Sequence, residues 1–196
     1  MAEEGIGKKI RAALSQPDTL PSMRRYFVNT MFDATFVMLG VIIGSALSSD
    51  PRHAIIITTM LTSTVSLAIS TGTSVYEAES LEQSRRMNEI GRAMLTNVED
   101  TDIGRASRTS ILLIAAINMM APLMTGLVLI TPFLFISIEQ VVMAAEIAIG
   151  LAITMMFITG FIMGRTSGKN PFVKGARMAV IGIAAFVICY LIGGAV

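Results

Sequence analysis

Five stretches of the chain are apolar almost without interruption, and each is long enough to cross a membrane as a helix. A helix needs about 20 mostly apolar residues for this, at a rise of 1.5 Å per residue. The runs are continuous and do not alternate apolar with polar positions, which favours helices over barrel strands. The spans are Phe27–Leu47, Ala54–Tyr76, Ile111–Ile136, Val141–Met163 and Phe172–Val196. We therefore expect an all-α integral membrane protein with five transmembrane helices.

The segments outside the spans complete the predicted organisation. In residues 1–26, apolar positions recur at helical spacing between Ile6 and Leu14, with lysines turned elsewhere. This pattern predicts a cytoplasmic amphipathic helix on the anionic inner leaflet, with a frayed tail as the alternative. Spans one and two occupy residues 27–76, and spans three to five occupy residues 111–196. Between them, residues 77–110 form a short charged cytoplasmic segment that continues the second helix and turns between Asn97 and Gly104.

The lysines and arginines predict the orientation. Residues 1–26 carry five of them, the segment between spans two and three carries five, and the loop between spans four and five is surrounded by four. Only Arg52 remains for the other side. The positive-inside rule therefore predicts a cytoplasmic N-terminus and an outside C-terminus, in a multi-pass protein of the cell membrane.

Composition agrees with this assignment and limits other chemistry. Of 196 residues, 53% are hydrophobic and 15% are charged, and the mean hydropathy is +0.69. A soluble domain carries about a quarter charged residues. Cys189 is the single cysteine, so no disulfide within the chain is expected. His53 is the single histidine, and its place in a short outer loop predicts a solvated side chain.

Asp33 is the most informative polar residue, because it lies inside the first span. It follows the Arg24-Arg25 pair by about two helical turns, or roughly 12 Å. An ionised carboxylate at the centre of a span costs roughly 2.5–3.5 kcal/mol on insertion scales, so such groups usually serve a pathway or a counter-charge. The alternative is a carboxylate hydrated near the interface or paired with one of the two arginines.

A stripe of polar residues follows the second span. Its members recur at steps of three and four, which places them on one helix face. They are Thr59, Ser63, Ser66, Ser70, Thr73 and Glu77. Hydroxyls can hold helices together, but a stripe that ends in a carboxylate also fits one wall of a hydrated path. Glu146 is a second intramembrane carboxylate and lies roughly along one face with Gly150, Thr154 and Gly164.

Carboxylates also collect in the cytoplasmic segment after the second span. Glu79 and Glu82 share a face at i, i+3, and Glu89 follows one heptad later. A cluster for divalent cations is one interpretation, and a solvated helix with paired arginines is the other.

Glycine pairs predict close helix contacts. Gly40 and Gly44 form a small-xxx-small pair in the first span, and Gly160 and Gly164 form another in the fourth. Such pairs let helix backbones approach within one chain or between two.

Several stretches resemble the vacuolar iron transporter family of divalent-cation exporters. They are residues 33–36 with 41–44, residues 68–72 with Tyr76 and Glu79, residues 122–134, and residues 175–193. Two departures indicate a divergent member. Thr71 stands where the family has methionine, and Val75 stands where it has glutamate, so Glu77 is the nearest carboxylate. The cytoplasmic segment is also shorter than in the family's iron transporters.

The resemblance implies a homodimeric exporter of Fe2+ or Mn2+ that exchanges the cation for protons, with the pathway between subunits. Two copies of Asp33 would then face one ion, and close carboxylates share protons readily. Such ions accept carboxylate oxygens, while a thioether such as that of Met119 adds preference for softer ions. Methionine is nonetheless more often packing than ligand. The candidate metal ligands are Asp33, Glu77, Glu79, Glu82, Glu146 and Met119.

Two other functions remain as alternatives. One is a membrane scaffold or metal sensor with the same fold and no transport. The other is an intramembrane aspartyl protease using Asp33 and Glu146, which their predicted positions toward opposite faces of the membrane argue against. No Ser-His or Cys-His pair lies within the spans to support other hydrolysis. We expect no enzymatic activity, no cofactor beyond the transported ion, and no nucleic-acid partner. The expected partners are divalent metal ions, protons, membrane lipid and a second copy of the chain.

Overall fold

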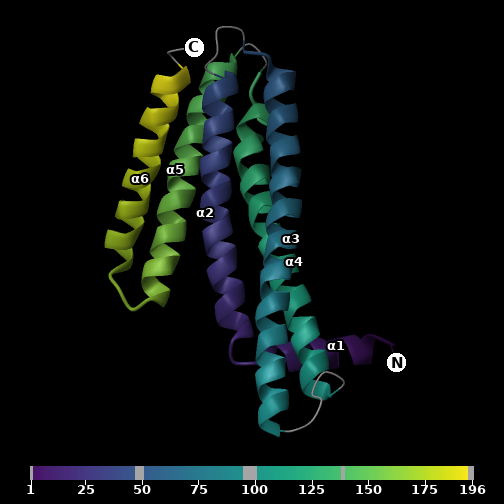
Figure 1. The fold of residues 1–196 in the computed structure, drawn as a ribbon. Coiled ribbons are helices and arrows are strands. Elements are labelled where there is room, and N and C mark those ends of the chain that lie inside the picture. The colour runs from purple at the N-terminus through teal and green to yellow at the C-terminus, as the bar shows by residue number, and fades with distance from the viewer. Residues whose placement is uncertain (1, 47–50, 95–100, 138–139, 194–196) are drawn as a thin grey trace. The chain divides into compact units, whose positions relative to one another are not determined.

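The computed structural model describes residues 2–46, 51–94, 101–137 and 140–193, and these contain helices but no strand. Six helices follow one another along the chain (Figure 1): α1 (Ala2–Leu14), α2 (Thr19–Ala46), α3 (His53–Met94), α4 (Asp102–Phe135), α5 (Val141–Thr166) and α6 (Pro171–Gly193). The helices α2 to α6 are each long and apolar enough to cross a membrane. This confirms the all-α fold with five spans, and α1 forms the helix predicted before them.

The helices extend beyond the apolar runs at their charged ends. The second span continues without a break to Met94, as predicted. The next helix begins at Asp102, so the prediction of a turn reaching Gly104 is wrong for its last residues, while residues 95–100 lie outside the described part. The reason is local, since the Arg105 N–H donates to the carbonyl of Thr101 at 3.0 Å and so closes the first turn of α4.

The chain divides into two compact units, and α2, α3 and α4 contribute to both. The first unit combines Met1–Phe27 with Ile69–Met120. The second combines Val28–Ala68 with Ala121–Val196.

The core of the second unit is built from methionine and aliphatic side chains on four helices. Met38 of α2, Met60 of α3, Leu129 of α4 and Ala148 of α5 are all fully buried within it. Buried threonines on these helices donate to the carbonyl one turn earlier, as Thr35 does to Met31 at 2.7 Å. This bond satisfies the hydroxyl within its own helix, so the polar group does not disturb the apolar packing.

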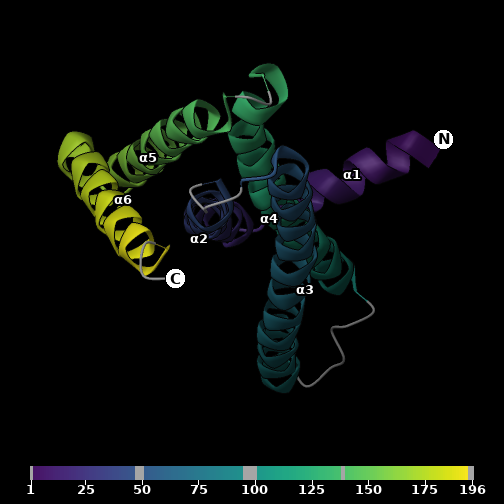
Figure 2. The ribbon, with the colours of Figure 1, turned by 90° about the horizontal axis from the view of Figure 1, so that it is seen from above.

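Glycines hold α6 against α5, which lies beside it in the views of Figure 1 and Figure 2. A Cβ atom added at Gly160 would lie 2.9 Å from the carbonyl oxygen of Lys174, and one at Gly164 would lie 2.7 Å from Cα of Pro171. The predicted close contact of this glycine pair is therefore made within the chain. Glu146 lies about five helical turns before Gly164 on the same side of α5, as predicted, but it is exposed while Gly164 is buried against the start of α6.

His53 begins α3 and differs from its prediction as a solvated loop residue. Its ring is half-buried, and Nε2 donates to the carbonyl oxygen of Phe133 at 2.6 Å. That carbonyl belongs to the last turn of α4, whose carbonyls have no partner within their own helix. The histidine therefore caps the end of α4.

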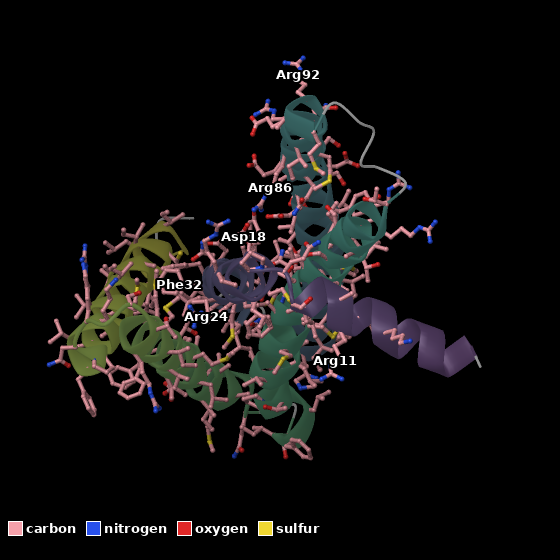
Figure 3. The ribbon with its side chains drawn as sticks, turned by 90° about the horizontal axis from the view of Figure 1, so that it is seen from below. Arg11, Asp18, Arg24, Phe32, Arg86 and Arg92 are labelled. Carbon is pink, nitrogen blue, oxygen red and sulfur yellow. The ribbon has the colours of Figure 1, made fainter. Side chains whose placement is uncertain are left out.

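In the first unit, polar contacts join the start of α2 to α3 and α4. The buried hydroxyls of Thr19 and Ser110 lie 2.6 Å apart. Asp18, just before α2, forms an ion pair with Arg86 of α3, and Figure 3 shows these two side chains close together. A small apolar cluster of Met23, Val75 and Ile114 packs near them. These contacts fix the segment that forms the candidate site.

Candidate metal-ion site

Glu79 and Glu82 share a cavity in the first unit, on the face predicted by their spacing. The cavity has a volume of about 590 Å³ and lies between the start of α2 and the part of α3 beyond its apolar run. Glu79 is only 7% exposed, whereas Glu82 is exposed. A carboxylate this deeply buried needs a compensating partner, because removing its hydration is costly.

The partners of Glu79 come from α2. The Tyr26 hydroxyl interacts with the Glu79 carboxylate and also with the Arg25 guanidinium. Arg25 lies over the Tyr26 ring, with Cζ 5.1 Å from the centroid, an arrangement that attracts a cation to the ring face. Sequence reasoning missed Tyr26 because its contact with Glu79 joins residues 53 positions apart.

Acidic and basic side chains line this cavity, but only some of them form ion pairs. Asp18 is bound to Arg86, and both side chains are about half exposed, so water screens the pair and its contribution to stability is small. Glu79 and Glu82 form no ion pair with any described residue. The exposed Glu82 carboxylate is therefore open to a cation, and Glu79 can add an oxygen that the Tyr26 hydroxyl does not use.

None of the other predicted ligands lines this cavity. Glu77 is exposed and does not line the cavity. Met119 packs over Gly72, where its Cγ lies 2.1 Å from the position that a Cβ would take, so it serves helix contact between α3 and α4. Asp33 and Glu146 belong to the second unit and are both exposed. Among the described residues, no group of three His, Cys, Asp or Glu side chains could hold a metal ion.

Most residues of the polar stripe of α3 are exposed. Ser66, Ser70, Thr73 and Glu77 are exposed, while Thr59 and Ser63 are half-buried. Hydrocarbon is a poor environment for such a line of hydroxyls and a carboxylate. A second protein surface or water therefore has to cover it in a membrane.

Asn118 of α4 adds a polar group that is not among the predicted ligands. Its side chain is fully buried and Nδ2 donates to the Thr71 carbonyl at 3.1 Å, but Oδ1 has no hydrogen-bond partner among the described residues. Pro122 follows four residues later and has no N–H to donate to the Asn118 carbonyl. An asparagine four residues before a proline within a span was the signal that could have found it.

Five membrane-length helices, with intramembrane carboxylates among them, define a multi-pass α-helical membrane protein. The sequence model of the VIT family matches residues 85–194, which are more than half of the chain. The chain belongs to the VIT family. Its departures from the vacuolar iron transporter motifs make it a divergent member.

Comparison with individual proteins gives one long match and shorter ones. An uncharacterized protein of Methanocaldococcus jannaschii is 25% identical over 171 residues, which are 86% of this chain and 87% of that protein. Vacuolar iron transporter 1 of Oryza sativa subsp. japonica is 35% identical over 65 residues, or 33% of this chain and 25% of the plant protein. Vacuolar iron transporter 1 of Tulipa gesneriana is 35% identical over 71 residues, or 36% of this chain and 28% of the plant protein. The matches thus span about a quarter of the plant transporters' length.

Proposed function

We propose that this chain is a metal-ion transporter of the cell membrane, which works as a homodimer and exports Fe2+ or Mn2+ in exchange for protons. Membership of the VIT family and the similarity to two vacuolar iron transporters support the class of function. The observation that carries the proposal is the uncovered polar stripe of α3, because an exposed line of hydroxyls on a membrane span fits the wall of an ion path.

A two-fold dimer would complete this path. Gly40 and Gly44 of α2 have no described atom within 4 Å of an added Cβ, so this small-residue surface is open for another helix. Asp33 precedes Gly40 by one heptad, lies near the same face and is exposed. In an isologous interface each residue approaches its own copy, so two Asp33 carboxylates would meet at one ion. Two close carboxylates hold a shared proton when the cation leaves, which couples the two movements.

Glu79 and Glu82 would receive the cation first, on the cytoplasmic side, with Glu77 at the mouth of the path. Their oxygens suit Fe2+ and Mn2+, which also accept neutral oxygens such as that of Asn118. Glu146, exposed on α5, is the proposed carboxylate of the other half of the membrane, and Met119 is the proposed source of a thioether. Transport involves no bond-making step, and we propose no enzymatic activity.

The test is cation and proton flux in sealed proteoliposomes. Purified protein is reconstituted with a pH dye inside, and Fe2+ (under reducing conditions), Mn2+, Zn2+, Ca2+ and Mg2+ are added singly. We expect Fe2+ or Mn2+ to enter and protons to leave together, and protein-free liposomes serve as the control. Folded protein that moves neither would contradict transport and favour a scaffold or metal sensor. Cation entry without proton movement would contradict the exchange alone.

A further inference from the structure

A second cavity of the first unit has a different chemical character. Its volume is about 460 Å³, and it lies between α3 and the first turns of α4. The Arg108 guanidinium, the Gln83 amide and several hydroxyls line it, but no aspartate or glutamate of the described residues does. The two cavities thus share Gln83 of α3 but differ in charge, since Glu79 and Glu82 line the first and no described acidic residue lines the second.

Two hydrogen-bond donors in this second cavity, the Gln83 amide and the Arg108 guanidinium, have no acceptor among the described residues. The buried Ser107 hydroxyl donates to Oε1 of Gln83 at 2.9 Å, which uses the amide oxygen and leaves the amide N–H groups as donors. Arg108 is exposed, and no described carboxylate pairs with it, in contrast to Arg86 and Asp18. Donors and a positive charge without a carboxylate are the requirements of an anion.

The rim of the cavity is apolar and open to the surroundings. Leu112 is 60% exposed and Tyr76 is 41% exposed. Tyr76 ends the predicted second span and Ile111 begins the third, so the cavity lies at the boundary of the membrane, on the side predicted to be cytoplasmic. That leaflet carries the anionic lipids, and basic pockets between helices there bind their headgroups.

We propose that this cavity binds the phosphate group of an anionic phospholipid. The Arg108 guanidinium pairs with the phosphate, while the Gln83 amide and the Ser80 and Ser84 hydroxyls donate to its oxygens. The acyl chains lie along Leu112 and Tyr76. A divalent cation suits this cavity poorly because none of the described carboxylates lines it, and a free phosphate would leave the apolar rim without an occupant.

Native mass spectrometry of the full chain in detergent tests the site. Phosphatidylglycerol or phosphatidylcholine is titrated, and bound lipid is counted. Both lipids carry the phosphate, but the choline ammonium of phosphatidylcholine adds a positive charge that Arg108 repels, whereas phosphatidylglycerol keeps a net negative charge. We therefore expect the wild type to retain phosphatidylglycerol about tenfold more tightly. Arg108→Gln should bring the two lipids close to equality. Arg105→Gln is the matched control, since Arg105 lies on the same helix, is exposed and does not line the cavity.

Ser84→Asp gives a second test, because it places a negative charge in the cavity without changing Arg108. It should also abolish the preference for phosphatidylglycerol, and circular dichroism checks that each variant is helical. Equal retention of both lipids by the wild type, or an unchanged preference in both folded variants, would overturn the site. Displacement of the lipid by sn-glycerol 3-phosphate at equal concentration would assign the cavity to a soluble phosphate and overturn the lipid as its ligand. Because none of these measurements uses flux, the site and the transport proposal fail separately.

Discussion

Asp33 is exposed on α2, although Ala34 and Thr35 beside it are fully buried. Asp33→Asn keeps the size of this side chain and removes its charge. We expect the variant to lose cation flux, because a neutral amide neither holds the cation nor carries the exchanged proton. Its dimer should stay intact. Proteoliposome flux and the elution volume in detergent measure the two properties.

Glu89→Gln is the control for Asp33, since it also removes one carboxylate from an exposed helical position. Glu89 lines neither cavity of the first unit. Flux of the control should equal that of the wild type. Normal flux by Asp33→Asn would remove Asp33 from the path.

Asn118 separates stability from function. Asn118→Leu removes an unpartnered buried oxygen together with one hydrogen bond to a helix carbonyl that needs no second donor. An unsatisfied buried polar group costs about 1–3 kcal/mol, so we expect the thermal unfolding midpoint to stay level or rise. Flux should fall if the amide oxygen serves the ion. A lower midpoint would show that the amide is structural, and unchanged flux would exclude it as a ligand.

The helices were predictable from sequence because each apolar run is continuous and long. The pairing of Glu79 with Glu82 was also predictable, because it depends only on helical spacing. The contact of Glu79 with Tyr26 was not, since it depends on how α2 packs on α3. The start of α4 was also missed. Its first turn is closed by the backbone hydrogen bond from Arg105 to Thr101, and no apolar run marks it in the sequence.

Substitutions in the two glycine pairs should have different effects, because one pair packs within the chain and the other is proposed to pack between two chains. Gly160→Leu would force a side chain against the backbone of α6, where a Cβ would already lie 2.9 Å from the Lys174 oxygen. We expect this substitution to lower the free energy of unfolding of the chain by about 1–3 kcal/mol, as overpacked side chains do. Gly40→Leu meets no described atom of its own chain, so the fold should persist while the dimer weakens.

Detergent-solubilised protein distinguishes these results. Thermal unfolding reports the fold, and size-exclusion chromatography reports the dimer. Gly40→Cys adds a positive test, because the proposed interface predicts efficient crosslinking between subunits. A folded dimer that does not crosslink would place the ion path elsewhere.

The distribution of charge over the whole chain predicts its orientation. Cys189 is the single native cysteine, so Cys189→Ala gives a background without thiols. In that background Lys169→Cys, between α5 and α6, should react with a membrane-impermeant maleimide from the cytoplasmic side only. Arg52→Cys, before α3, should react from the outside only. The reverse pattern would invert the topology and turn the proposed export into import.

Within the described part of α6, the buried residues are Gly175 and Gly182. Added Cβ atoms there would lie 2.9 Å from the Phe157 ring and 2.3 Å from the Met156 sulfur. A complete substitution library of α6 should therefore give an uneven map of tolerance. Outward positions such as Val180 and Ile188 should accept almost any apolar side chain, so that related chains drift freely in sequence there. The positions of this helix that tolerate change least should therefore be two residues that have no side chain.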